Sequence, residues 1–292
     1  MKSLVSSSIA QTESPGSLKL ISVKNLSFRY FGSTAPILQE IDLEIGEKEI
    51  VLIVGHSGSG KSTLLRAING LIPHQHNGEY QGDVIVDGLS VRQTEMSQLA
   101  LKVGYIFQNP ENQIFMFSVE RDIGFGLENL GLPKEEIRER VNWAMDLLKI
   151  GDLALRAPHE LSDGQKQRVA IAGVIAMRPK ILILDEPTSL LDPFAARELV
   201  KLVQSLRAEL GITILIVEHR LDLVAKVSDR LVVMSDGKIV LQGNPRDILS
   251  RSDVSDYGVT VPAVVRLAKT LGLSGDTLPL DSIELRAAVR AH

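Results

Sequence analysis

The stretch 49–73, which reads EIVLIVGHSGSGKSTLLRAINGLIP, decides the fold of this chain. Its apolar run at 50–54 ends at a glycine, which is typical of a buried strand. The residues GHSGSGKS at 55–62 then match the pattern G-x-x-x-x-G-K-[ST]. In such a loop, backbone N–H groups surround phosphate oxygens, and the N-terminus of the following helix adds its dipole. The stretch therefore predicts a phosphate-binding loop between a strand and a helix, and Pro73 is expected to end this helix.

The loop supplies most of the expected nucleotide-binding residues. Lys61 is expected to reach the β- and γ-phosphates, and Ser62 to ligate Mg²⁺. The full set expected around the phosphates is Gly55, His56, Ser57, Gly58, Ser59, Gly60, Lys61, Ser62 and Thr63. We name the segment Gly55–Ser62 the phosphate loop.

Strand and helix patterns alternate along the rest of the chain. Helical segments at 133–150 and 195–210 carry apolar residues at spacings of three and four. This alternation indicates an α/β fold with a mainly parallel sheet. The strands are expected at 18–28, 37–45, 49–55, 82–88, 103–108, 179–187, 212–219 and 229–240.

Four regions are expected. Residues 1–17 read as a tail, because they lack the sustained apolar segment of a signal peptide. The nucleotide-binding domain spans 18–249 and contains a helical insertion at about 109–178. Residues 250–292 form a small helical extension.

Composition limits the possible environments and partners. The 292 residues are 44% hydrophobic and carry a net charge of −4, so the basic excess of a nucleic-acid binder is missing. The chain has no cysteine, which fits a reducing compartment. No apolar run approaches the ~20 residues of a membrane-spanning helix. We expect a cytosolic protein that reaches a membrane only through partners.

A pair of acids follows a second buried strand, in ILILDEP at 181–187. The apolar run delivers Asp185 to the carboxyl end of the strand, where a carboxylate can hold Mg²⁺. Glu186 stands next to it and is placed to act as general base toward an attacking water. Together with the phosphate loop, this pair predicts a nucleotide-hydrolysing site.

Six motifs in order resemble those of the ATP-binding cassette ATPases. They are the phosphate loop, IFQNPENQ with Gln108, LSDGQKQR at 161–168, LILDEP, SLLD with Asp192, and VEH with His219. The resemblance covers residues 18 to about 249. It implies the phosphate-loop core with an N-terminal antiparallel β subdomain, an inserted helical subdomain and a C-terminal helical extension.

The family resemblance also implies roles for single residues. Gln108 resembles the glutamine that senses the γ-phosphate beside the metal, and His219 the switch histidine that contacts this phosphate. Asp192 resembles the aspartate that couples two sites across a dimer. In this family two chains pair head to tail, and the turn Ser162–Gln165, which we name the signature turn, faces the ATP of the partner. Ser162, Gly164 and Gln165 are therefore expected to bind that ATP.

An aromatic residue before the phosphate loop is expected to stack on adenine. Tyr30 matches the family position, and Phe28 and Phe31 are alternatives. His74 and His76 in PHQH could suggest a metal site. The sequence offers no third ligand beside them, so a solvated turn is favoured.

A narrower resemblance points to the ATPases of energy-coupling factor transporters, which import cobalt, nickel and vitamins. It is carried by FQNPENQIF, LSDGQKQRVAIAG and the tail VPAVVRLAKTLGL. It implies a second ATPase subunit, identical or paralogous, held partly by residues 250–292. It also implies a membrane-embedded coupling protein with a substrate-binding membrane protein, and a position at the cytoplasmic face of the cell membrane.

Phenylalanine is concentrated beside Gln108. Four of the seven phenylalanines lie between 107 and 125, namely Phe107, Phe115, Phe117 and Phe125. They suit a groove for a helix of a membrane partner. Packing inside the helical insertion is the alternative.

Two other functions remain open. One is the ATPase of a conventional importer or exporter of the same family. The other is a soluble ATPase acting on nucleic acid or ribosomes, which lacks support because no basic face, coiled coil or second cassette is visible.

One residue departs from the family pattern. Asp163 occupies a position where the family usually has glycine. Ser162 and Gln165 have the spacing of a capping box, which makes Asp163 the first helical residue. A negative charge there favours the helix dipole by ~0.3–1 kcal/mol, whereas a carboxylate 4 Å from a phosphate costs up to about 4 kcal/mol. We expect the side chain to turn away from the phosphate.

Overall fold

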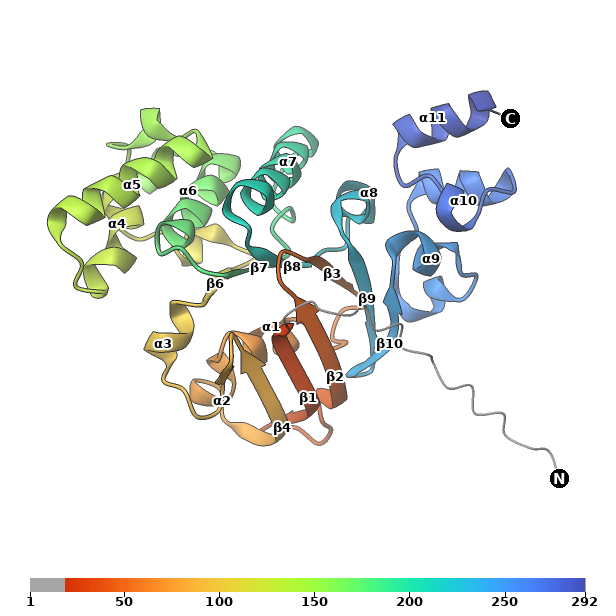
Figure 1. Ribbon diagram of the computed structural model, residues 1–292, viewed down its shortest axis with the longest axis horizontal. Coiled ribbons are helices and arrows are strands. Elements are labelled where there is room, and N and C mark those ends of the chain that lie inside the picture. Colours follow the sequence, from red (N-terminus) through yellow and green to blue (C-terminus); the bar gives the residue numbers. More distant parts are fainter. Residues whose placement is uncertain (1–18, 292) are drawn as a thin grey trace.

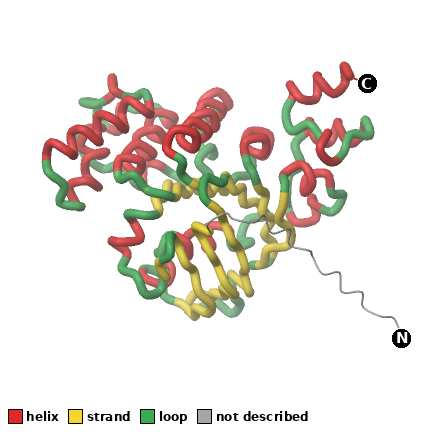
Figure 2. The backbone as a smooth tube through the Cα atoms, in the orientation of Figure 1, coloured by secondary structure: helices red, strands yellow, loops and turns green. Residues whose placement is uncertain are grey.

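The computed structural model describes residues 19–291, which form two β-sheets and the helices that pack beside them (Figure 1, Figure 2). The tail predicted at 1–17 lies outside the described residues. The larger sheet has the order β10-β9-β3-β8-β7-β6, and all neighbours run parallel except β10 and β9. Its strands are β3 (Ile50–Val54), β6 (Val103–Ile106), β7 (Ile181–Asp185), β8 (Thr213–Val217), β9 (Arg230–Ser235) and β10 (Lys238–Gly243).

The smaller sheet is antiparallel and comes from the N-terminal part of the described chain. Its order is β2-β1-β4-β5. Its strands are β1 (Lys19–Tyr30), β2 (Leu38–Gly46), β4 (Gly78–Val86) and β5 (Leu89–Ser90). Together the two sheets confirm the predicted α/β core with an N-terminal antiparallel β subdomain.

The parallel sheet is buried on both faces, which explains why its strands are continuous apolar runs. In β3, Ile50, Leu52 and Val54 belong to one hydrophobic core, and Val51 and Ile53 belong to the other. The first core contains the helical insertion and the C-terminal helices, and the second joins the parallel sheet to the antiparallel one. Successive side chains of β3 point to opposite faces of the large sheet, so this strand packs against both hydrophobic cores.

Helices cover the sheets and form the insertion. The helix α1 follows the phosphate loop, and α4, α5 and α6 lie between β6 and β7 at one end of the large sheet (Figure 1). The helices are α1 (Lys61–Ile68), α2 (Leu71–His74), α3 (Met96–Ala100), α4 (Val119–Asn129), α5 (Lys134–Leu148), α6 (Asp163–Ala176), α7 (Pro193–Leu210), α8 (Leu221–Val224), α9 (Pro245–Ser250), α10 (Ala263–Thr270) and α11 (Ser282–Ala291). The 3₁₀ turns are η1 (Pro110–Asn112), η2 (Gly151–Leu153), η3 (Pro158–Glu160), η4 (Ala225–Val227), η5 (Val254–Tyr257) and η6 (Gly275–Thr277).

The C-terminal extension, residues 250–291, packs on the other end of the large sheet, beyond β9 and β10 (Figure 1). Asp281 and Glu284 bind Lys226 at 2.6 and 3.4 Å, and Glu284 also binds Arg246 at 3.0 Å. These contacts tie the start of α11 to the α/β core.

Three element boundaries differ from the sequence-based expectation. The helix α1 ends at Ile68 and not at Pro73, because Gly70 adopts a φ of 88° that breaks the helix. The segment 229–240 forms a hairpin, since Asp236 and Gly237 both have positive φ, as a tight two-residue turn requires. The strand β8 ends at Val217, so His219 lies just beyond it. Within residues 19–291, no helix is both long and apolar enough to cross a bilayer.

Candidate functional site

The phosphate loop leaves the buried strand β3 and is packed closely by backbone. A Cβ at Gly55 would lie 2.0 Å from the carbonyl oxygen of Met234 in β9, so only glycine fits. Gly60, with a φ of 101°, precedes α1 and would place a Cβ 2.7 Å from the carbonyl oxygen of Ile37. The glycines of the motif therefore serve close packing as well as the loop conformation.

The side chain of Lys61 folds into the loop. Its ammonium group donates to the carbonyl oxygens of Gly55 and His56, both at 2.9 Å. Burial lowers the pKa of Lys61, and the nearby carboxylates of Glu186 and Asp185 act in the opposite direction. This loop therefore holds a buried cation where phosphate oxygens are expected to bind.

Asp185, at the end of β7, meets two hydroxyl groups. The hydroxyl of Ser62 donates to one carboxylate oxygen at 3.1 Å, and the hydroxyl of Tyr105 donates to the other at 2.7 Å. Carboxylate and hydroxyl oxygens are the ligands that Mg²⁺ prefers, so the pair of Ser62 and Asp185 fits this ion.

Tyr105 is a site residue that the sequence reasoning missed. It is buried in β6, beside β7, and its pKa is raised by burial and by the charge and hydrogen bond of Asp185. The available clue was a tyrosine in a short, otherwise apolar strand, since a buried tyrosine hydroxyl needs a hydrogen-bond partner.

Glu186 joins three segments of the chain. The amide of Gln108 donates to one carboxylate oxygen at 2.8 Å, and Nε2 of His219 lies 3.2 Å from the other. The Glu186 backbone has a φ of 51°, and its N–H donates to the carbonyl of Val217 at the end of β8. The structure thus brings together Gln108, Glu186 and His219, which sequence analysis had selected separately.

Glu218 is a second residue that the sequence reasoning missed. Its buried carboxylate accepts N–H bonds from Thr188 at 2.9 Å and from His219 at 3.1 Å. It therefore fastens the segment that carries His219 to the loop after β7. A charged residue between a buried strand and a histidine predicted to be functional was the available clue.

The aromatic residues before the phosphate loop occupy different environments. Phe28 is 1% exposed and packs inside the β subdomain, which removes it from the candidates for adenine stacking. The hydroxyl of Tyr30 lies 3.4 Å from Oγ1 of Thr63, just after the phosphate loop. Phe31 is 71% exposed and remains an alternative.

The two histidines of PHQH make no metal site with other residues. Nε2 of His74 lies 2.8 Å from the carbonyl oxygen of Val91, and the ring of His76 lies edge-on to Tyr30. In the described part of the chain, no group of three or more His, Asp or Glu side chains is arranged to hold a metal.

The signature turn begins α6 with the predicted capping box. The hydroxyl of Ser162 accepts from the N–H of Gln165 at 3.4 Å, and the side chain of Gln165 accepts from the N–H of Ser162 at 2.9 Å. Asp163 is the first residue of the helix, and its carboxylate lies 3.8 Å from Nζ of Lys166, which also binds Glu111.

Asp192 lies beside this turn. It caps α7 by accepting from the N–H groups of Phe194 at 2.7 Å and Ala195 at 3.0 Å, and these bonds lower its pKa. A Cβ at Gly164 would contact Ala195 at 3.4 Å. Within residues 19–291, no hydrogen bond joins the signature turn or Asp192 to the phosphate loop.

The phenylalanines near Gln108 divide into two groups. Phe107 packs against Tyr105 at the edge of the β-subdomain core. Phe115 and Phe117 are 61% and 86% exposed, and Phe115 stacks edge-on with Phe125 of α4 at 4.8 Å. Internal packing therefore does not account for Phe115 and Phe117.

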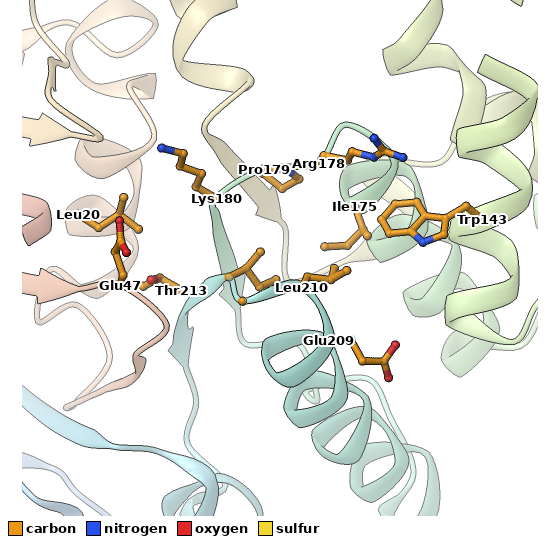
Figure 3. Close-up of a pocket in the computed structure, with 12 residues that line it drawn as sticks. Leu20, Glu47, Trp143, Ile175, Arg178, Pro179, Lys180, Glu209, Leu210 and Thr213 are labelled. Atoms are coloured by element: carbon orange, nitrogen blue, oxygen red, sulfur yellow. The ribbon is translucent and has the colours of Figure 1, made fainter. Parts of the chain in front are cut away.

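A cavity of about 520 Å³ lies at the opposite, amino-terminal edge of the large sheet (Figure 3). It is lined by Lys180 and Thr213, next to the starts of β7 and β8, and by Trp143 of the helical insertion. The guanidinium group of Arg178 lies over the indole of Trp143, 5.3 Å from the ring centroid. The predicted site residues lie at the carboxyl edge, and none of them lines this cavity.

Comparisons with known proteins agree with this geometry. The model of the ABC transporter family matches residues 38–189. A putative ABC transporter ATP-binding protein of Pyrococcus abyssi is 42% identical over 261 residues, which cover 89% of this chain and 93% of that protein. An energy-coupling factor transporter ATP-binding protein of Streptococcus pneumoniae shows the same identity and coverage.

Solved structures are also similar. CbiO1 of Clostridium perfringens, described as part of the ABC transporter complex CbiONQ, has a TM-score of 0.74 and 36% identity, covering 87% of this chain and 99% of that one. A dimeric ATP-binding cassette in a post-hydrolysis state, bound to ADP and Pi, has a TM-score of 0.67 and 28% identity, covering 77% and 99%.

Proposed function

The chain belongs to the ABC transporter family, and we propose that it energises an importer of the energy-coupling factor type for a metal ion or a vitamin. As a member of this family it is an ATPase. The importer type is supported by the similarity to the Streptococcus pneumoniae protein and to CbiO1.

The observation that carries the proposal is the meeting of four segments around Asp185 and Glu186. The phosphate loop, β6 with its continuation to Gln108, the end of β7 and the segment after β8 all reach the carboxyl edge of the sheet. In parallel α/β sheets this edge is where ligands bind.

In the proposed reaction, Glu186 accepts the proton of the attacking water as general base. Its two contacts, with Gln108 and His219, hold the carboxylate in place and connect it to the segments expected to sense the γ-phosphate. Lys61 exchanges its carbonyl partners for phosphate oxygens. Ser62 and Asp185, with Gln108 nearby, would hold Mg²⁺, whose charge offsets that of the β- and γ-phosphates.

The second half of each site comes from a partner ATPase subunit in this proposal. Within the described residues, Ser162, Gly164, Gln165 and Asp192 make no hydrogen bond to the phosphate loop of their own chain. A head-to-tail dimer would place these residues on the ATP of the other subunit. Because one chain carries both halves, a homodimer would contain two complete sites.

The membrane partners would dock beside Gln108 at the cytoplasmic face of the membrane. Phe115 and Phe117 offer exposed aromatic surface there, as partner-binding grooves do. A membrane-embedded coupling protein, which in turn holds a substrate-binding membrane protein, is the proposed partner. Nucleic acid is not a proposed partner, since the chain has a net charge of −4.

The hydrolytic role is tested with Glu186→Gln. We expect this variant to bind ATP and to form an ATP-dependent dimer, while kcat falls by roughly 10²–10⁴-fold, as loss of a general base does. Glu209→Gln, which changes an exposed carboxylate at the opposite edge of the sheet, is the control. Unaltered turnover in Glu186→Gln would show that another group is the base.

The transporter type is tested by co-purification from membranes. Recovery of the tagged chain with a coupling protein and a small substrate-binding membrane protein supports the energy-coupling factor type. Recovery with a conventional transmembrane pair and no separate substrate-binding membrane protein would contradict it.

A further inference from the structure

The C-terminal extension touches the phosphate loop at Gly258. Gly258 follows the 3₁₀ turn η5, and its Cα lies against the backbone of His56, the second residue of the phosphate loop. A Cβ added to Gly258 would lie 2.6 Å from Cβ of His56, and 3.0 Å from both its Cα and its backbone nitrogen. Real Cβ atoms do not approach other atoms this closely, so a larger residue forces one of the two segments to move.

Gly258 is fixed in this position by its own turn. Its φ of 74° and ψ of 19° place it in the left-handed region, and its N–H donates to the carbonyl of Ser255 at 3.1 Å. The residues around it are anchored, because Val254, Val259 and Val261 are buried in the core that also contains β3 and β9. The extension cannot yield at Gly258 without disturbing that core.

Other contacts also restrict movement of the phosphate loop. Gly55 is packed against the carbonyl of Met234, and the ammonium group of Lys61 holds the carbonyls of Gly55 and His56. A displacement of His56 would therefore shift the carbonyl that Lys61 binds and the N–H groups expected to bind phosphate. Misplacement of a binding group by about 1 Å can cost 10²-fold in activity.

We propose that the C-terminal extension supports the phosphate loop through the contact of Gly258 with His56, and that this contact sets the affinity for Mg-ATP. Gly258 is a positioning residue, since it acts through His56. This inference rests on the proposed role of the loop in nucleotide binding. It gives the extension an action on the ATP site of its own chain, in addition to any role in holding a partner subunit.

The coupling is reciprocal. If docking of the extension favours the ATP-binding form of the loop, ATP must stabilise the docked extension by the same free energy. Amide hydrogen exchange in the segment 254–261 should therefore slow when Mg-ATP binds to the full-length wild-type chain.

The experiment compares Gly258→Asn with Gly272→Asn. Both glycines have positive φ, 74° and 80°, and asparagine tolerates this region, so backbone strain is matched. A Cβ at Gly272 would meet nothing within 4 Å, whereas one at Gly258 meets His56. We expect the Kd for Mg-ATP, measured by titration calorimetry, to rise about tenfold or more in Gly258→Asn and by less than about twofold in Gly272→Asn.

A double variant identifies the colliding residue. His56→Gly removes the nearest atom that the new side chain meets. The loss of affinity caused by Gly258→Asn should therefore be smaller in the His56→Gly background than in the wild type. An equal loss in both backgrounds would show that Gly258 acts elsewhere.

The outcomes separate this inference from the proposed function. If the wild type fails to bind Mg-ATP, the proposed function is wrong. If the wild type binds and folded Gly258→Asn binds equally well, the inference alone is overturned. If Gly258→Asn does not fold, the hydrogen-exchange measurement decides, and unchanged exchange at 254–261 on binding of Mg-ATP overturns the inference.

Discussion

Replacing Asp163 by glycine tests which way the signature turn directs its negative charge. The carboxylate lies 3.8 Å from Nζ of Lys166, and the side chain is 60% exposed. The capping box uses only Ser162 and Gln165, so it survives the substitution. We therefore expect Asp163→Gly to leave the phosphate-facing geometry of the turn intact.

The two possible orientations of the Asp163 carboxylate predict rate changes that differ by about a hundredfold. A unit charge 4 Å from a phosphate costs about 4 kcal/mol at an effective dielectric of 20, which corresponds to roughly 10³-fold in rate. A side chain turned to solvent and to Lys166 should instead change the rate by less than about tenfold, or 1.4 kcal/mol. The stability cost combines a lost dipole interaction of ~0.3–1 kcal/mol, a lost surface ion pair of at most about 1 kcal/mol and the lower helix propensity of glycine.

The assay is the steady-state rate of ATP hydrolysis at saturating Mg-ATP, together with thermal unfolding. Asp163→Asn is the matched control, because it removes the charge and keeps the Cβ. We expect both variants to stay within tenfold of the wild type and Asp163→Gly to be the less stable one. A rise of much more than tenfold in both would refute the reasoning, since it would mean that the carboxylate faces the phosphate and restrains hydrolysis.

Three further predictions follow from the contacts. Tyr105→Phe removes the hydroxyl that donates to the carboxylate of Asp185 at the end of β7. We expect the unfolding free energy, measured by denaturant unfolding, to fall by about 1–3 kcal/mol, and the Mg²⁺ concentration needed for activity to rise. Unchanged values of both would contradict this role of Tyr105. Phe117→Ser should lower co-purification with the membrane coupling protein and leave the basal rate of ATP hydrolysis within about twofold, because the side chain is exposed and lies outside the predicted nucleotide site. An equal loss of co-purification and of ATP hydrolysis would argue against a docking role. The pKa values of Asp281 and Glu284 are lowered by their contacts with N–H groups and cations, which outweigh the opposing effect of burial. The stabilisation from these carboxylates is therefore present above the unfolded-state pKa of about 4 and is lost as the pH falls through the folded-state value. The raised pKa of Lys226 makes its contribution disappear only as the pH rises above about 10.4. The protection factors of the α11 amides, which correct each exchange rate for the intrinsic rate at the same pH, should therefore fall below about pH 4, and an equal fall in Asp281→Asn would exclude this carboxylate as the cause.

The residues predicted from sequence are those whose function depends on local backbone. The phosphate loop needs glycines at fixed spacing, and Asp185 is placed by the apolar strand that ends at it. The capping box of Ser162 and Gln165 is likewise a matter of spacing along one turn. Such features are visible in a single short segment, and the structure reproduces their geometry.

The ends of helices and strands were less predictable, because they depend on the conformation and hydrogen bonds of single residues and not on the periodicity of the segment. Pro73 was expected to end the first helix, but Gly70 ends it earlier through its positive φ. Periodicity placed the end of β8 at His219, whereas the strand ends at Val217 because Glu218 turns inward to accept backbone N–H bonds. In both places one residue ended the element earlier than the hydrophobic periodicity of the segment predicted.

The contacts that sequence could not show join residues far apart in the chain. Tyr105 meets Asp185 only because β6 and β7 are neighbours in the sheet, and Gly258 meets His56 only because the C-terminal extension returns to the phosphate loop. Neither residue stands in a motif, so its own segment offers no reason to select it. Yet each contacts a motif residue, Tyr105 through its hydrogen bond to Asp185 and Gly258 through its close approach to His56. If these contacts act as proposed, the motifs specify which groups meet ATP, and the surrounding fold determines how firmly those groups are held.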